Sequence, residues 1–457
     1  MNPTTTRRDF LAGSAGFATA GFASLANPIA AAAQSVGVKA GDLPDLTIKE
    51  VKVYVTDISN VHKLNGSETG ELISVVTNSG IEGNYTLGDR DPTVGWLDWA
   101  KTALVGKSIV DLLPTMTSTT GMKGRAGFDG PMMRRPPGQM GGGAGGRGTG
   151  PAFGGAAAGS GVFTRGGGSW PNFFTAAADV CMWDILGKAV NRPIYKILSG
   201  GTPTKEKVMA YASSQHLPTV EDYVPDVLKA KGLGYKAYKI HPGGGQHATG
   251  PAIPSYIGHM EEIREVRKAV GDEFVLMHDP VQQYNRFEAM AVGRLLDELD
   301  YLWFEDPVRS TDQEGLIELC AALNLAIHVG EFLYSISDFA EYIKRDALDV
   351  VRLIADNVGG ISGSMRVGLL ADAHGLECTP HNWGNTGDMA LHFHVELALP
   401  NSSWFEMPFP HEYADRPYYK DKFRIDADGY VHAPTEPGLG FPLDFDALEK
   451  ITKRIDR

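Results

Sequence analysis

The sequence predicts an α/β fold in which a parallel barrel is joined to a second, smaller α+β domain. The chain has 457 residues, more than one ordinary compact core needs. Strand-like and helix-like segments alternate from residue 207 over about two hundred residues, as they do in parallel sheets. Short apolar runs end in Asp279, Glu305 and Glu331, and each step between these acids is 26 residues.

The segment before the barrel predicts a short antiparallel sheet. Apolar side chains alternate along residues 46–77, the turn 78–80 follows, and a helical pattern covers 96–104. From residue 121 to residue 168 the composition changes, because 19 of these 48 residues are glycine. Such a segment cannot bury enough apolar surface to offset its chain entropy, so we expect a flexible insertion in the first domain.

The second half of the chain predicts the barrel. Residues 172–198 have helical periodicity, and strands and helices alternate after them. The expected strands are 208–211, 237–241, the three runs that end in acids, 349–353 and 376–380. An open sheet is the alternative, but polar residues that follow strands from the first to the last favour the barrel. The tail has hairpin character at 423–425, 429–431 and 437–440, and we expect it to return to the first domain.

The N-terminus resembles a twin-arginine export signal. Residues 6–11 read Thr-Arg-Arg-Asp-Phe-Leu, and an apolar stretch rich in alanine and glycine follows to residue 33, where small residues offer a cleavage site. The alternative is a disordered tail with paired arginines. We expect an exported, periplasmic bacterial protein. The chain then divides into a signal peptide (1–33), a first domain (45–200) that contains the insertion (121–168), a barrel (205–405) and a C-terminal segment (406–457).

The three acids predict a metal site. A step of 26 residues fits one strand, one loop and one helix, so Asp279, Glu305 and Glu331 would lie at the carboxyl ends of neighbouring parallel strands. Converging carboxylates repel one another, and a hard divalent cation neutralises them. We expect one Mg²⁺ per subunit, with Mn²⁺ as the alternative. Each acid alone could be a helix cap or a solvated loop residue, but the equal spacing favours the metal.

Composition excludes some classes of function. The net charge of −13 argues against a nucleic-acid partner, whose phosphates need a basic face. A small anionic substrate remains compatible, because a metal and local cations decide the field in a pocket. The three cysteines are widely spaced and odd in number, so we expect buried small hydrophobes and no disulfide framework. Beyond the N-terminal stretch, no segment reaches the about 18 uncharged apolar residues of a membrane span.

Several further segments resemble the enolase superfamily, in the branch of mandelate racemase, muconate lactonizing enzyme and the acid-sugar dehydratases. Residues 176–188, followed by Pro193, resemble the long linker helix of that family. Similar segments recur in order at 359–361, 379–382 and 437–440. The resemblance implies a modified (β/α)7β TIM-type barrel, with an α+β capping domain built from the N-terminal region and the C-terminal tail.

The resemblance also implies roles for individual residues. The metal ligands map onto Asp279, Glu305 and Glu331, and the paired catalytic lysines of the family map onto Lys239 and His241. Residues two apart on a strand face the same side, and histidine replaces lysine in some enolase-type sites, so His241 can transfer a proton there. The alternative for His241 is a loop residue before the Pro-Gly-Gly sequence 242–244.

On the opposite face the base of the family maps onto His381. The aspartate that often orients this imidazole would fall at Ile354, so the dyad is broken and a neighbour would have to substitute for it. The candidates are Asp349, Arg352, Asp356 and Asn357. His381 would then be a general acid, a weak base or a hydrogen-bond donor to the substrate. The expected substrate-binding residues are Glu406, Asn382 and Tyr85.

The implied chemistry is removal of a proton next to a carboxylate, with magnesium stabilising the enediolate. We expect dehydration of a sugar acid by a hydro-lyase, since two imidazoles suit a base and an acid. The alternatives are a racemase, epimerase or cycloisomerase of the same superfamily, or a non-catalytic exported binding protein. We expect a homo-oligomer. His392 and His394 lie two apart on an expected helix, where they point to different sides, so no metal role is predicted for them.

Overall fold

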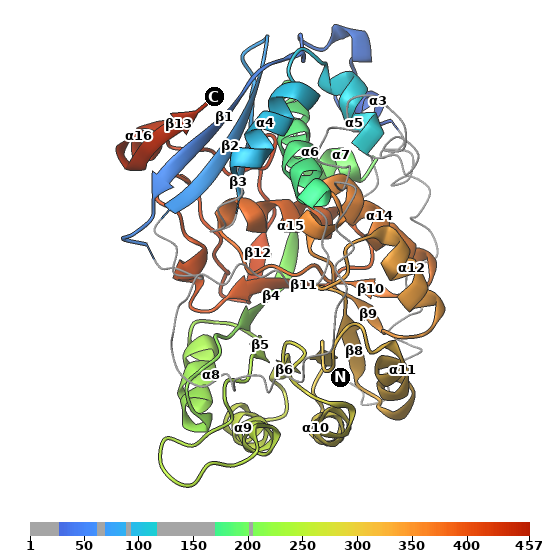
Figure 1. The fold of residues 1–457 in the computed structure, drawn as a ribbon, viewed down its shortest axis with the longest axis vertical. Coiled ribbons are helices and arrows are strands. Elements are labelled where there is room, and N and C mark those ends of the chain that lie inside the picture. The colour runs from blue at the N-terminus through green and yellow to red at the C-terminus, as the bar shows by residue number, and fades with distance from the viewer. Residues whose placement is uncertain (1–26, 62–68, 88–92, 117–169, 201–203) are drawn as a thin grey trace, which may run out of the picture.

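The computed structural model describes residues 27–61, 69–87, 93–116, 170–200 and 204–457. The predicted glycine-rich insertion (121–168) and most of the predicted signal peptide (1–26) lie outside these ranges. An antiparallel sheet with its helices lies above a barrel of parallel strands (Figure 1). No described helix combines the length and hydropathy that crossing a bilayer requires.

The first domain is built on a four-stranded antiparallel sheet in the order β13-β1-β2-β3. The strands from the N-terminal region are β1 (Ile48–Asp57), β2 (Thr69–Thr77) and β3 (Glu82–Leu87). Alternate side chains Val51, Val53 and Val55 of β1 are buried, which confirms the predicted sheet. The helices of this half are α3 (Pro28–Ser35), α4 (Thr93–Ala103), α5 (Ile109–Met116), α6 (Trp170–Ala189) and α7 (Ile194–Leu198).

The barrel follows the order (β/α)7β, as expected. Its parallel strands are β4 (Lys207–Ser213), β5 (Ala237–Ile240), β6 (Val275–His278), β7 (Trp303–Glu305), β8 (Ala326–Val329), β9 (Val350–Val351), β10 (Glu377–Cys378) and β11 (Trp404–Pro408). The spatial order is β10-β9-β8-β7-β6-β5-β4-β11. The last strand therefore returns to the first, where Phe405 of β11 pairs with Ala210 of β4.

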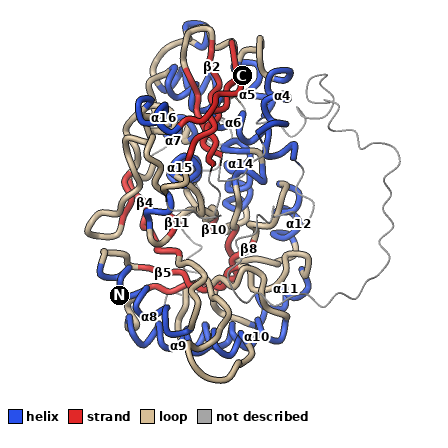
Figure 2. The backbone as a smooth tube through the Cα atoms, turned by 60° about the vertical axis from the view of Figure 1, so that its left-hand side comes forward, coloured by secondary structure: helices blue, strands red, loops and turns tan. Residues whose placement is uncertain are grey.

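Helices cover the outside of these strands (Figure 2). They are α8 (Tyr223–Gly232), α9 (Ser255–Val270), α10 (Arg286–Glu298), α11 (Gln313–Ala322), α12 (Ile336–Lys344), the short α13 (Ala355–Val358), α14 (Gly360–Ala373) and α15 (Thr386–Ala398). Side-chain caps define several helix starts, since Asn285 and Ser335 accept from the third backbone N–H of α10 and α12. All three cysteines are free and buried, as predicted from the sequence.

The C-terminal segment divides between the two halves, which differs from the expected return of the whole tail to the first domain. Strand β11 pairs parallel with β4, and β12 (Tyr430–His432) pairs antiparallel with β4. The tail also reaches the first domain, where Leu439 donates its backbone N–H to Asp184 of α6. Helix α16 (Phe445–Ile451) and β13 (Thr452–Asp456) follow, and β13 pairs with β1. The reason is pairing: Met209 of β4 pairs with Trp404 of β11 on one edge and with Tyr430 of β12 on the other.

Helix α6 connects the sheet, the barrel and the tail. Asp179 accepts the backbone N–H of Ser362 on α14 at 3.0 Å. Asp184 accepts the backbone N–H groups of Asn84 on β3 and of Leu439 in the tail, both at 2.9 Å. Gly83 allows β3 to approach α6, because a Cβ there would lie 2.0 Å from the Cys181 carbonyl oxygen. These contacts fix the first domain over the barrel mouth.

Candidate active site

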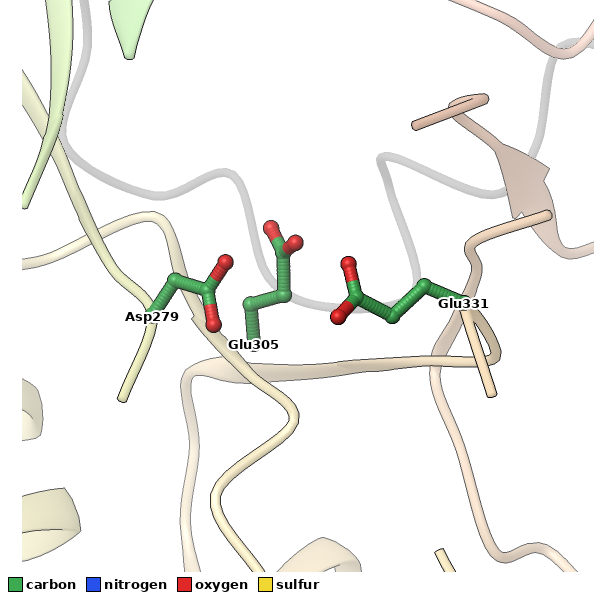
Figure 3. Close-up of side chains that lie close together, drawn as sticks. All are labelled: Asp279, Glu305 and Glu331. Atoms are coloured by element: carbon green, nitrogen blue, oxygen red, sulfur yellow. The ribbon is translucent and has the colours of Figure 1, made fainter. Parts of the chain in front are cut away.

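Three carboxylates meet at the carboxyl ends of neighbouring strands (Figure 3). Asp279 follows β6, Glu305 ends β7 and Glu331 follows β8 after one glycine. One oxygen from each lies within 4.8 Å of the others, and all three side chains are buried. Gly330 is required before Glu331, since its φ is 138° and a Cβ would lie 2.3 Å from the carbonyl oxygen of Arg352. The three acids that recur at equal steps in the sequence therefore lie together in the structure.

Lys239 of β5 places its ammonium among these acids. Its Nζ lies 2.9 Å and 3.0 Å from the two oxygens of Glu305, 3.3 Å from Asp279 Oδ2 and 2.8 Å from Glu406 Oε1. Its side chain is fully buried. Burial and Arg352 oppose the charged form, but Glu305 and Glu406 hold the pKa of Lys239 well above its ordinary value. Lys239 is therefore a fixed positive charge and not a proton acceptor.

Arg352, directly after β9, provides a second buried cation. Its guanidinium pairs through Nε with Glu305 and through Nη2 with Glu406. Nη1 donates to the hydroxyl of Tyr211 at 3.1 Å. Nε also lies 4.0 Å from Glu331 Oε2. The sequence named Arg352 only as a possible substitute for the missing aspartate, but the structure places it against two of the three acids.

Glu406 of β11 is enclosed by partners. It pairs with Lys239 and Arg352, accepts the hydroxyl of Ser213 at 2.8 Å and accepts the backbone N–H of Asn382 at 2.7 Å. Asn382 also donates its side-chain amide to the carbonyl of Glu406 at 2.9 Å. Both side chains are fully buried. The predicted substrate-binding residues Glu406 and Asn382 thus contact each other, and their role toward a substrate stays a prediction.

His241, after β5, lies beside Asp279. Its Nε2 is 2.9 Å from Asp279 Oδ2, and its Nδ1 is 2.6 Å from the carbonyl oxygen of Ser214. Since a carbonyl can only accept, Nδ1 donates, and this fixes the orientation of the ring. The rings of His216 and Trp383 lie 5.4 Å and 5.6 Å from it, and they hold it from two sides.

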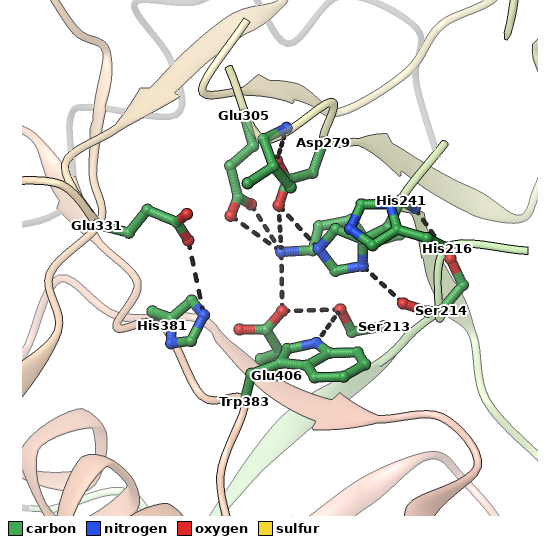
Figure 4. Close-up of polar contacts among 12 residues, drawn as sticks. Ser213, Ser214, His216, His241, Asp279, Glu305, Glu331, His381, Trp383 and Glu406 are labelled. Carbon is green, nitrogen blue, oxygen red and sulfur yellow. Dashed lines mark hydrogen bonds and ion pairs between the residues drawn. The ribbon is translucent and has the colours of Figure 1, made fainter. Parts of the chain in front are cut away.

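His381, after β10, lies on the other side of the acids, near Glu331 (Figure 4). Its Nε2 is 3.6 Å from Glu331 Oε2, too long for a hydrogen bond. About one fifth of its side chain is exposed (22%). Burial and the nearby charge of Arg352 hold the pKa of His381 well below its ordinary value. The imidazole is therefore neutral.

The residues near the missing aspartate have hydrogen-bond partners elsewhere. Ile354 caps the short helix α13. Asp349 accepts the backbone N–H of Ile327 at 3.0 Å, and Asn357 donates to the carbonyl of Glu331 at 2.9 Å. Asp356 accepts the hydroxyl of Tyr85 at 2.9 Å. Of the four candidate substitutes, Arg352 is the one that pairs with the acids.

Tyr85, the third predicted substrate-binding residue, connects the first domain to the barrel. It lies on β3, and its hydroxyl is 2.9 Å from Asp356 Oδ1 and 3.1 Å from Asp388 Oδ1. Its side chain is fully buried. Burial and the two carboxylates raise its pKa well above the ordinary value, so the phenol stays protonated. A direct contact with a substrate stays a prediction.

The charge balance of the site fits a divalent cation. Burial and the neighbouring Asp279 raise the pKa of Glu331 to about 8, although Arg352 and Lys239 oppose the shift. Burial, Glu331 and Asp279 also raise the pKa of Asp306 well above its ordinary value. The two buried cations therefore do not balance the acids. The site thus lacks positive charge, and its three close carboxylate oxygens are the ligand set of a hard ion such as Mg²⁺. Among the described residues, no other set of His, Cys, Asp or Glu has this geometry.

The two histidines of α15 accept hydrogen bonds from the backbone. His392 Nε2 accepts the N–H of Ala355 at 3.1 Å, and His394 Nδ1 accepts the N–H of Tyr195 at 3.2 Å. Burial lowers the pKa of each to about 4, which keeps both rings neutral as acceptors.

Sequence reasoning missed several residues of this site. Ser213 and Ser214 follow the apolar core of β4, and Trp383 donates its indole N–H to Ser213 Oγ at 2.9 Å. One signal was present: these serines end their strand as the three acids end theirs. Trp383 carried a weaker signal, as it lies two residues after His381.

The fold and the acid triad define an enolase-type barrel, and comparison with known families agrees. Residues 222–447 match the family model described as Enolase C-terminal domain-like. The chain belongs to the enolase superfamily, in the branch of mandelate racemase and muconate lactonizing enzyme.

Its relatives in sequence include sugar-acid dehydratases. An L-talarate/galactarate dehydratase of Salmonella typhimurium is 30% identical over 268 residues, which are 58% of this chain and 62% of that enzyme. The match therefore spans less than two thirds of that relative. An arabinonate dehydratase of Saccharolobus solfataricus is 28% identical over 59% of this chain and 69% of its own length.

Solved structures share the fold. A D-glucarate dehydratase from Agrobacterium tumefaciens, complexed with magnesium, has a TM-score of 0.68 at 24% identity, over 90% of this chain and 100% of its own. An L-talarate dehydratase from Polaromonas, complexed with Mg and L-glucarate, has a TM-score of 0.66 at 22% identity, over 90% and 98%.

Proposed function

We propose that this protein is a metal-dependent hydro-lyase that removes water from a sugar acid. The observation that carries the proposal is the placement of two imidazoles on opposite sides of a buried oxygen triad (Figure 4). A proton can thus be taken on one face of a substrate and delivered on the other. The dehydratases among the relatives support the reaction class, and the sugar acid itself is open.

The metal site is proposed to hold one Mg²⁺ per subunit through Asp279, Glu305 and Glu331. When bound, the ion supplies Lewis acidity that stabilises the enediolate form of a carboxylate substrate. Lys239 adds a fixed charge beside it, since its ammonium is 3.3 Å from Asp279 and 2.9 Å from Glu305. Mn²⁺ is the alternative ion.

The proton steps are assigned from the partners of each ring. His381 is neutral and has no hydrogen bond to Glu331, so it accepts the proton from the carbon next to the carboxylate. His241 faces acceptors at both nitrogens, Ser214 O and Asp279 Oδ2, so it is set to donate. It gives its proton to the hydroxyl on the next carbon, which leaves as water while the electron pair of the broken C–H bond forms the C=C bond. The sequence predicted a proton transfer by His241 and left open which of His241 and His381 is the base.

The test is hydrogen exchange and product formation in heavy water with magnesium and a library of sugar acids. His381→Asn should lose both exchange and dehydration, because nothing removes the proton. His241→Asn should keep exchange on the substrate carbon but lose dehydration. If the two variants behave in the reverse way, the two roles must be exchanged. Exchange without loss of water on every substrate would favour a racemase or epimerase.

Glu305→Gln tests the metal site independently of the imidazoles. The substitution is nearly isosteric and removes one charge from the centre of the triad, so Mg²⁺ affinity should fall by at least about a hundredfold, or about 2.7 kcal/mol. Calorimetric titration measures this, and circular dichroism should show a retained fold. Glu318→Gln on the exposed face of α11 is the matched control. Unchanged Mg²⁺ binding in Glu305→Gln would overturn the assignment. Binding of Mg²⁺ by the wild type without exchange on any substrate would favour a non-catalytic binding protein.

We also propose export by the twin-arginine route, a homo-oligomeric state and the domain boundaries given above. The sequence of residues 6–11 supports the export proposal. Fusion of residues 1–40 to a reporter should direct it to the periplasm, and replacement of Arg7 and Arg8 by Lys should block this. Light scattering of the purified protein gives its molar mass and so tests the homo-oligomeric state.

A further inference from the structure

Arg352 is held entirely by the protein. Its side chain is fully buried, and its partners are Glu305, Glu406, the Tyr211 hydroxyl at 3.1 Å and the Pro380 carbonyl at 3.4 Å. A substrate therefore does not reach most of its N–H groups. Its position after the sixth barrel strand is close to the place where the family resemblance leads one to expect an aspartate, at Ile354. On this side of the site a positive charge is present where a negative one was expected.

The two buried cations, Lys239 and Arg352, both contact Glu305. Lys239 Nζ is 2.9 Å from Glu305 Oε2, and Arg352 Nε pairs with Glu305 Oε1. Arg352 is also the cation near Glu331, at 4.0 Å. A cation bound to these acids would share the charge of Glu305 with Lys239 and Arg352. Positive charges at this range repel a divalent ion strongly in a buried site, since screening by water is weak there.

We propose that Arg352 is a positioning residue that weakens the hold of the triad on its divalent ion. By pairing with Glu305 and Glu406, it takes part of the negative charge that would otherwise neutralise the ion. The bound ion then keeps more of its charge for a substrate oxygen. This inference rests on the proposed metal site, but it goes beyond it by assigning a function to a residue that is no metal ligand.

Glu406 provides an independent test of the same idea. It is no member of the triad, yet it pairs with both cations, at 2.8 Å from Lys239 and in direct contact with Arg352. Removing its charge leaves both cations less neutralised. The effect on the divalent ion should therefore be opposite to that of removing Arg352.

The experiment is calorimetric titration of the full-length protein with Mg²⁺, repeated with Mn²⁺ by electron paramagnetic resonance. Arg352→Met, similar in length but uncharged, should bind the ion at least about tenfold more tightly, equivalent to about 1.4 kcal/mol. Arg352→Lys keeps the charge and should stay within about threefold of the wild type. Glu406→Gln should bind the ion at least about tenfold more weakly. A residue that only supports the fold would not tighten binding when it is removed.

The control is Arg267→Met, which removes a buried arginine of α9 whose guanidinium donates only to the backbone carbonyls of Leu299, Gly271, Phe274 and Asp300. Its Mg²⁺ affinity should equal that of the wild type. Equal or weaker binding by Arg352→Met overturns the inference. If Arg352→Met does not fold, Glu406→Gln is the deciding variant. Mg²⁺ binding by Glu406→Gln that equals or exceeds that of the wild type would then overturn the inference. Failure of the wild type to bind Mg²⁺ would instead overturn the proposed metal site.

Discussion

At the scale of the residue, the site is governed by buried charge. Asp279 and Glu406 are ionised although burial opposes this. Lys239 and His241 hold the pKa of Asp279 well below its ordinary range. Arg352 and Lys239 do the same for the pKa of Glu406. Glu331 lacks such a partner at short range, and its pKa rises to about 8. A buried acid that keeps its proton near neutral pH is the group on which ion binding depends most.

The raised pKa of Glu331 predicts a pH dependence of both metal binding and stability. In the metal-free protein the folded state keeps a proton that the unfolded chain releases above its ordinary pKa of 4.5. Stability should therefore fall as pH rises from 4.5 towards 8. A bound divalent ion requires the ionised acid, so Mg²⁺ affinity and the rise in Tm on adding Mg²⁺ should both increase over the same range.

Calorimetric and thermal titrations with EDTA or Mg²⁺ at a series of pH values measure these effects. Glu331→Gln is the matched variant and should show a much flatter pH dependence of metal-free stability. A Tm increase on adding Mg²⁺ that is the same at every pH would contradict the role of Glu331.

At the scale of the element, β3 connects the two halves of the molecule. One face of the strand lies against α6, where Asn84 donates its backbone N–H to Asp184. The opposite side chain, Tyr85, reaches Asp356 before α14 and Asp388 in the first turn of α15. Both acids follow the sixth and seventh barrel strands closely. The first domain is thus attached at the mouth of the barrel, near His381.

Tyr85→Phe should destabilise the protein by about 1.5–3 kcal/mol, the range for a hydrogen bond to a charged group, because two half-buried carboxylates lose the hydroxyl that they share as a donor. Urea denaturation measures the loss. Tyr256→Phe on α9, whose ring packs against Phe287, is the control and should change stability little. If Tyr85→Phe keeps full stability but raises KM, the phenol would instead contact the substrate, as the sequence predicted.

At the scale of the whole molecule, the eighth parallel strand, β11, pairs with the first, β4, and the last residues of the chain complete the antiparallel sheet. Strand β13 pairs with β1, so the C-terminus completes a sheet that begins near the N-terminus. The tail between them crosses from β12 on the barrel to α16 beside the sheet. Folding of the two halves is therefore linked through the tail.

Deletion of residues 121–168 should leave Tm within a few degrees of the wild type. The reason is composition: 19 glycines in 48 residues supply little apolar surface for a core. Differential scanning calorimetry of the deletion variant measures this. Deletion of a segment of β13 is the contrasting case and should lower Tm clearly, because the sheet loses a strand. A large loss in the first variant would show that the insertion is packed.

The sequence by itself determined the alternation of strands and helices after residue 207 and the acid triad, because local periodicity and the length of one strand–helix unit are written in the chain directly. The (β/α)7β class was implied by the resemblance to the enolase superfamily. The burial of the three cysteines followed from their apolar neighbours. The boundary of the last barrel strand and the division of the tail did not follow, because they depend on how β11 and β12 pair with the two edges of β4.

Only the tertiary structure decided which charges meet. Arg352 pairs with Glu406, 54 residues away, and Tyr85 meets Asp356, 271 residues away. Asn382, after β10, donates two hydrogen bonds to Glu406 on β11, and a motif match cannot reveal this contact. The physical reason is that a barrel brings the ends of all its strands to one mouth. Pairing there is set by burial and distance across the barrel, and sequence separation carries no information about either.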